Sequence, residues 1–196
     1  MTEANQRQTD QPVNALFLER WSPRAFDGKP MPAADLMTVL DAARWAPSAN
    51  NNQPWRFIYG IHGTEAFDRL ASLLVDGNRR WAEKAGALVF IVSVDKTGKP
   101  GDAERRAIPT HSFDAGAAWM ALALQARMLG YFTHAMAGVK KDEIPAALGF
   151  NGDMTMEAAV AIGHMGQPDS LPEELKAREK PNQRHPLSDL AFEGGF

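Results

Sequence analysis

Two short clusters of polar residues carry the groups best suited to hold a charged, flat ligand. The first is the run Arg20-Trp21-Ser22-Pro23-Arg24, which places two guanidinium groups and a hydroxyl close together in the sequence. Guanidinium groups form paired hydrogen bonds with phosphate oxygens, so this run could hold a phosphate. A solvated charged turn is the simpler explanation when these residues are taken alone.

The second cluster is the run from Ala46 to Trp55, in which positions 50 to 53 are consecutive side-chain amides between two prolines. Amides offer hydrogen-bond donors and acceptors together, which suits the rim of a heteroaromatic ring. The prolines would fix the backbone that approaches such a ring. A plain polar loop explains the same residues equally well.

Three weaker features could also contact a charged or flat ligand. The run Met136-Ala137-Gly138 follows a predicted strand and is small enough for its backbone to approach a flat ligand. Asn78 and Arg184 are polar residues that, taken alone, would be ordinary surface residues. None of the three indicates a function by itself.

The residues that the chain lacks argue against several kinds of catalytic site. No cysteine occurs, which removes disulfides, thiolate nucleophiles and iron-sulfur clusters. The histidines are scattered, no serine has the flanking glycines of a nucleophile elbow, and neither a Walker A loop nor a dinucleotide glycine fingerprint is present. We therefore expect no metal, name no catalytic residue, and infer that a bound organic cofactor supplies the reactive group.

Size and charge narrow the class of protein further. The 196 residues are 44% hydrophobic and 23% charged, which suits one globular domain. A formal net charge of -3 and a pI near 6.0 leave no broad basic surface for nucleic acid. Residues 1–12 are polar and lack the features of a secretory signal, so we expect a loose N-terminal tail and a cytoplasmic protein.

Hydrophobic periodicity predicts an α+β fold in which helices and strands alternate loosely. The predicted strands are 55–61, 87–94, 131–136 and 156–162, and the predicted helices are 13–20, 32–46, 65–75, 113–129 and 140–148. The strand at 87–94 is apolar throughout, so we expect it at the centre of the sheet and buried on both faces. Residues 96–109 are expected to form an exposed loop, and the polar residues from 167 onward a tail that wraps a partner subunit.

The helix at 113–129 approaches the length of a membrane span, but Asp114, Gln125 and Arg127 interrupt it and much of the rest is alanine. We expect no membrane span here. Residues 113, 117, 120, 124 and 128 are apolar at helical spacing, and the alanines between them allow neighbouring helices to come close. The pattern indicates a helix buried nearly all round, in a domain core or a subunit interface.

Taken in order, these clusters resemble the nitroreductase family of FMN-dependent oxidoreductases, over a span from about Leu16 to Leu187. The resemblance is carried by three stretches, which are residues 20–26, residues 46–55 and the start of the alanine-rich helix at residues 114–116. It implies an α+β fold with a central mixed or antiparallel sheet flanked by helices, formed by residues 13–196. It also implies an intertwined homodimer, in which two FMN molecules lie in clefts between the subunits.

The resemblance also implies which residues bind the cofactor. Those expected at the phosphate and one side of the flavin are Arg20, Ser22, Arg24, the backbone of Trp21 and, from the tail, Arg184. Those expected from the second subunit are Pro47, Ser48, Ala49 and Asn51, and Gln53 of the same run is also expected to bind the cofactor. Those expected along the ring are Asn78, at its pyrimidine edge, and the backbone of Met136, Ala137 and Gly138. The sequence departs from the family at Asn182, where a lysine is common, and at Trp81, where some members have a basic residue.

The implied activity is hydride transfer from NADPH or NADH, through bound FMN, to an oxidised small molecule such as a nitroaromatic or a quinone, by a ping-pong mechanism. Other flavin chemistry of the same superfamily stays open, including dehalogenation, dehydrogenation and flavin fragmentation. So do a non-catalytic flavin carrier or sensor and a cofactor-free binding module. The sequence does not distinguish the two nicotinamides or identify the acceptor.

Overall fold

The computed structural model of the chain describes residues 5–98, 101–150 and 152–196. Its centre is a four-stranded antiparallel sheet in the order β1-β2-β4-β3. The strands are β1 (Trp55–Ile61), β2 (Ala87–Val94), β3 (Phe132–Met136) and β4 (Met154–Gly163). The sequence predicted all of them, with ends within about two residues.

The strand β2 occupies an inner position between β1 and β4, as its composition predicted. Seven of its eight residues are buried. Side chains of β2 alternate between two hydrophobic clusters, with Leu88 and Phe90 on one face and Val89 and Ile91 on the other. Both faces are covered because helices pack against each of them.

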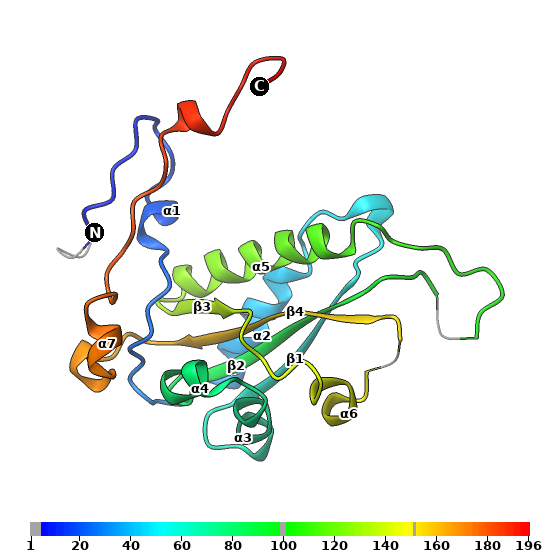
Figure 1. Cartoon of the computed structure of the whole chain (residues 1–196), viewed down its shortest axis with the longest axis horizontal. Coiled ribbons are helices and arrows are strands. Elements are labelled where there is room, and N and C mark those ends of the chain that lie inside the picture. Colours follow the sequence, from blue (N-terminus) through cyan, green and yellow to red (C-terminus); the bar gives the residue numbers. More distant parts are fainter. Residues whose placement is uncertain (1–4, 99–100, 151) are drawn as a thin grey trace.

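Two helices cover the face of the sheet that carries Val89 and Ile91, and smaller helices cover the other face (Figure 1). The first pair is α2 (Ala33–Ala43) and α5 (His111–Met128). The second group is α3 (Glu65–Ser72), α4 (Asp76–Ala82) and α6 (Ile144–Leu148). The sheet and its two layers of helices make the expected α+β architecture.

Within this chain, α5 is buried mainly on one side, so burial nearly all round would need the subunit interface that the sequence also allows. Ala118 and Leu122 face the sheet and are fully buried. Phe113 is 82% exposed and Met128 is 65% exposed, on the predicted apolar stripe of the opposite side. The small residues pack against β2 and α2. Helix α1 also contacts α5, and its Phe17 and Leu18 line one hollow with Met120, whereas the two ends of the stripe stay exposed.

The remaining helices differ from the prediction mostly in length. The first helix, α1, spans Ala15–Glu19, with the side chain of Asn14 accepting a hydrogen bond at its start. The expected helix at 140–148 begins only at Ile144, because residues 141–143 form a turn and Pro145 suits a first helical turn. Both α4 and α7 (Glu173–Lys176) were missed, since they are too short for a periodic pattern. Across the described residues, no helix has both the length and the hydrophobicity needed to cross a membrane.

The two ends of the chain run beside each other on one side of the molecule (Figure 1). The main-chain N–H of Gln8 donates to Gln183 Oε1 at 3.5 Å, and Gln183 Nε2 donates to the carbonyl oxygen of Gln6 at 3.0 Å. Residues 5–8 of the polar N-terminal segment thus have definite partners, which composition alone does not indicate.

Candidate functional site

A cavity of about 390 Å³ lies where four segments of the chain meet. Its lining residues come from the N-terminal segment, the turn after α1, β3 and the chain after α7. They are Arg7, Arg20, Trp21, Ser22, Arg24, His134, Ala177, Arg178, Lys180, Asn182 and Arg184. We call this the cationic pocket. It unites Arg20, Ser22 and Arg24 with the distant Arg184, and these are the side chains that the resemblance implies at the phosphate.

The charge of the cationic pocket is one-sided. Six of its lining residues are arginine or lysine, and none is an aspartate or glutamate. Burial, and then the neighbouring Arg184, lower the pKa of Arg20 from its usual value. The nearby carboxylate of Glu179 is engaged elsewhere, because it accepts main-chain hydrogen bonds from Arg24 and Ala25 at 2.8 Å. Such a concentration of like charge favours a bound anion.

The turn that carries Arg20 and Arg24 is held by contacts with β3. The His134 ring donates from Nδ1 to the carbonyl oxygen of Pro23 at 2.9 Å, since a carbonyl can only accept. Trp21 packs edge-on against Phe132, with 6.2 Å between the ring centroids. The hydroxyl of Ser22 accepts from Arg20 Nη1 at 3.4 Å. Sequence reasoning missed His134, because its role depends on a residue 111 positions away.

Trp81 lies in the core beneath this turn. It is 2% exposed and stacks on Phe26, with 6.3 Å between the ring centroids. Its ring is also 4.7 Å from that of His134, and the guanidinium carbon of Arg24 lies 6.0 Å from its centroid. Trp81 therefore packs inside the protein, in support of the pocket, and presents almost no surface to a substrate.

Asn78 and Gly138, which the resemblance placed along the same ring, are direct neighbours. Asn78 Nδ2 donates to the carbonyl oxygen of Gly138 at 3.1 Å. A Cβ atom at position 138 would lie 2.4 Å from that nitrogen, so the close approach requires glycine. Met136 is 4% exposed and so is buried as a whole residue, whereas Ala137 beside it is exposed.

The amide-rich loop lies apart from the cationic pocket, at the N-terminal end of α5. The main-chain N–H of Ala49 donates to Asp114 Oδ2 at 3.2 Å, and that of Gln53 donates to Ser48 Oγ at 3.0 Å. Asn50, Asn51 and Gln53 all have positive φ values. Asparagine tolerates this left-handed conformation better than most residues, so the amide run has a local backbone explanation as well. Neither Pro47 nor any other residue of the loop lines the cationic pocket of its own chain.

A second hollow, of about 550 Å³, shares Arg20, Ser22 and Arg184 with the cationic pocket. Its other lining residues come from α1, α5 and β3, and they are Phe17, Leu18, Trp119, Met120 and Ala135. An apolar surface thus adjoins the cationic one. The pair suits a ligand with one anionic end and one flat, apolar part.

Comparisons with known proteins show what this chain is similar to. The model of the nitroreductase family matches residues 18–78. A solved structure described as an oxidoreductase containing FMN is 50% identical, covers 100% of this chain and 98% of its own, and superposes with a TM-score of 0.94. An uncharacterised 15.4 kDa protein of Mycolicibacterium smegmatis is 34% identical over 148 residues, 71% of this chain and 95% of its own.

A protein of Streptomyces coelicolor, provisionally named an NADH dehydrogenase/NAD(P)H nitroreductase, is 29% identical over 177 residues. The match covers 80% of this chain and 85% of that protein. Taken together, the fold, the pocket and these matches define a nitroreductase-like α+β protein. The chain belongs to the nitroreductase family.

Proposed function

We propose that this chain binds FMN, with the phosphate in the cationic pocket. The observation that carries the proposal is the convergence of six cations, without a lining carboxylate, beside an apolar hollow. A phosphate monoester with two negative charges would offset the repulsion between the guanidinium groups. The similarity to a solved oxidoreductase containing FMN, at 50% identity over the whole chain, supports the same cofactor.

The proposed phosphate contacts are the side chains of Arg20, Ser22, Arg24 and Arg184, with the backbone of Trp21. All of these residues line the one cavity. Guanidinium groups at a phosphate supply strong, oriented hydrogen bonds, and the serine hydroxyl can donate one more. The packing of Trp21 and His134 would hold these donors in place before the ligand arrives.

At the ring, Asn78 and the backbone of Met136, Ala137 and Gly138 are the proposed contacts. Since Asn78 Nδ2 is used by the Gly138 carbonyl, its Oδ1 would accept a hydrogen bond from an N–H at the pyrimidine edge. Gly138 lets the backbone come close without a side chain in the way.

We infer that a second copy of the chain completes the site, in a homodimer. The apolar stripe of α5, whose end residues Phe113 and Met128 are exposed, is the surface that we expect the copies to share. The proposed contributions from the second copy are Pro47, Ser48, Ala49, Asn51 and Gln53. This arrangement would explain why the amide-rich loop does not reach the cationic pocket of its own chain.

When bound, FMN would supply the chemistry of hydride transfer between NADPH or NADH and an oxidised small molecule, such as a nitroaromatic or a quinone, in ping-pong order. The residues of the chain would bind and orient the reactants. The cations and the backbone donors would favour the negatively charged forms that arise during transfer. No side chain is assigned as a general acid or base. The provisional name of the Streptomyces coelicolor relative supports this activity.

The visible spectrum of the purified protein, before and after anaerobic addition of NADPH or NADH, tests the proposal. We expect a flavin spectrum that bleaches with at least one of the two donors and returns when a quinone or a nitroaromatic is added. A colourless protein that cannot take up FMN would contradict the cofactor assignment. Bound flavin that neither donor reduces would instead indicate a flavin carrier.

A further inference from the structure

We propose that Arg7, in the N-terminal segment, is a positioning residue of the cationic pocket that ties together the two walls carrying Arg20 and Arg184. The inference rests on the proposed function, because it assigns Arg7 to the grip on the phosphate. It concerns a residue that the sequence places in a polar tail, outside every cluster with evident chemistry.

Arg7 bonds to both walls with one guanidinium group. Its Nη1 donates to the carbonyl oxygen of Arg20 at 2.7 Å, and also to that of Leu18 at 3.3 Å. Its Nε donates to the carbonyl oxygen of Asn182 at 2.8 Å. The planar guanidinium thus spans from the end of α1 to the segment that carries Arg184. These acceptors are main-chain atoms, so the tie fixes the backbone on each side.

The wall that carries Arg184 depends on this tie. In the part of the chain that the structure describes, every hydrogen bond from residues 180–186 to another segment runs to residues 6–8. Arg184 itself bonds only to its close neighbours, through Nη1 to the carbonyl oxygens of Asn182 and Gln183. Without Arg7 and the glutamine pair, the segment has no described hydrogen bond to hold it beside Arg20.

Electrostatics makes such a tie necessary. Arg7, Arg20 and Arg184 carry like charges around one cavity, so they repel one another. Burial first, and then the charges of Arg184 and Arg20, lower the pKa of Arg7 from its usual value. An exposed chain segment under such repulsion would move away from the pocket, and ordering it again would weaken the binding of an anion. Hydrogen bonds from a cation to carbonyl groups oppose that movement.

The test compares FMN with riboflavin, which has the same ring and no phosphate, by fluorescence titration of the full-length chain. The variants are Arg7→Gln, which removes the charge and the tie, and Arg7→Lys, which keeps the charge but cannot span the walls. We expect each variant to weaken FMN binding about tenfold while riboflavin affinity stays unchanged. The loss of well-placed charged hydrogen bonds raises a dissociation constant by about this factor.

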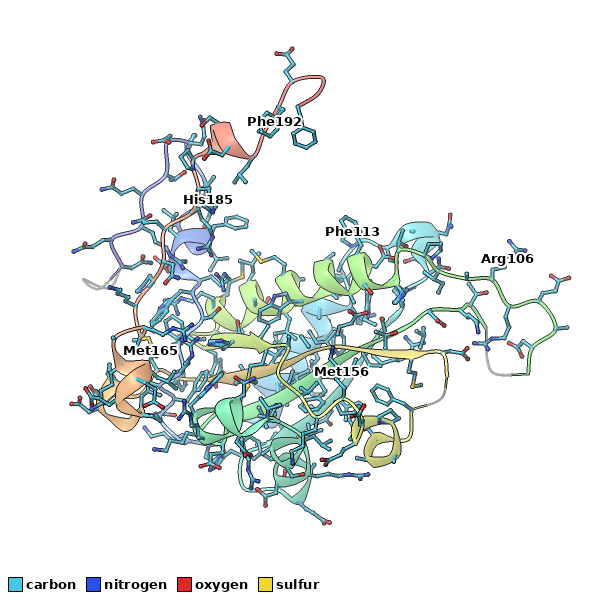
Figure 2. The ribbon with its side chains drawn as sticks, in the orientation of Figure 1. Arg106, Phe113, Met156, Met165, His185 and Phe192 are labelled. Atoms are coloured by element: carbon cyan, nitrogen blue, oxygen red, sulfur yellow. The ribbon has the colours of Figure 1, made fainter. Side chains whose placement is uncertain are left out.

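The matched control is Arg106→Gln, which removes an exposed arginine from a loop at the opposite side of the molecule (Figure 2). It changes the net charge as Arg7→Gln does, and it is expected to bind FMN like the unmodified chain. Thermal unfolding by circular dichroism shows that each variant is folded before binding is measured.

Three results would overturn the assignment of Arg7. One is unchanged FMN affinity in Arg7→Gln. Another is full affinity in Arg7→Lys, which would reduce the role to charge alone. The third is an equal loss of FMN and riboflavin, which would show a general structural effect. Failure of the unmodified chain to bind FMN would instead contradict the proposed function, so the two failures are distinguishable.

Discussion

At the scale of single residues, His134 links the pocket to the pH of the solution. Burial lowers the pKa of His134 to about 4, despite the hydrogen bond to Pro23 that opposes this shift. Arg24 and Arg20 add to the lowering. Folding therefore favours the neutral ring, and the stabilisation is complete above the ordinary pKa of about 6.5 and is lost as pH falls toward 4.

We predict that the free energy of unfolding decreases by on the order of 2–3 kcal/mol across this pH range because of His134. Urea titrations at a series of pH values, from above 6.5 down to 4, would measure the decrease. The variant His134→Gln should lose this contribution, whereas His185→Gln, which removes an exposed histidine of the C-terminal segment (Figure 2), should keep it. Equal pH dependence in all three proteins would exclude His134 as the cause.

Gly138 permits the closest contact in the candidate site. A Cβ atom there would lie 2.4 Å from Asn78 Nδ2 and 2.9 Å from Val75 Cγ2. We predict that Gly138→Ala displaces the Asn78 amide and lowers the free energy of unfolding by about 1–3 kcal/mol, as overpacking does. Denaturant unfolding measures this value.

The control for this prediction is Gly77→Ala, in the same helix as Asn78. A Cβ atom at position 77 meets nothing within 4 Å, so the free energy of unfolding should stay level or rise by up to about 1 kcal/mol. If the two variants were equally stable, the contact between Gly138 and Asn78 would not be tight in solution.

At the scale of elements, α5 contributes to two packing surfaces. Its small, buried residues pack on the sheet, and its exposed stripe, with Phe113 at one end, is the expected contact with a second copy (Figure 2). A symmetric dimer repeats each substitution, so one glutamate in the stripe places two unpaired charges in the interface. Burial of unpaired charge is costly, by several kcal/mol.

We predict that Phe113→Glu raises the dissociation constant of the dimer by at least about tenfold, which equals roughly 1.4 kcal/mol. Light scattering over a dilution series would measure it. Met165→Glu, at a partly exposed methionine on another side of the molecule (Figure 2), should dimerise like the unmodified chain. A chain that is monomeric at every concentration, or a Phe113→Glu variant that dimerises normally, would argue against the shared surface.

At the scale of the whole molecule, the local distribution of charge favours anion binding although the net charge is negative. The formal net charge is -3, yet six cations meet at one cavity. A ligand that binds only the folded chain stabilises it by mass action. Because FMN can use the cationic pocket and riboflavin cannot, FMN should stabilise the folded chain more than riboflavin does.

We predict that FMN at a hundred times its dissociation constant raises the free energy of unfolding by about 2.7 kcal/mol, which shifts Tm by roughly 5–11 °C in a chain of this size. Circular dichroism melting curves measure the shift. Riboflavin at the same concentration should give a smaller shift, because it cannot use the arginines. Equal shifts from both ligands would argue that the phosphate does not occupy the pocket.

The sequence alone was enough to predict the strands and the longer helices, and it singled out the arginine run at residues 20–24. Those features depend on local order: an alternating or continuous apolar run, a proline that begins a helix, and a short run of guanidinium groups. The buried strand at 87–94 and the grouping of Arg20 with Arg24 needed no knowledge of the rest of the chain.

Only the tertiary structure decided which distant groups meet. It brought the Nδ1 of His134 to the Pro23 carbonyl, turned Trp81 into the core, and joined Arg7 to both walls of the pocket. Such contacts leave no periodic trace in the sequence, because they depend on how the sheet, the helices and the two chain ends come together in space. The sequence therefore determined the kinds of groups this protein offers, and folding determined that one anion could be held by them together.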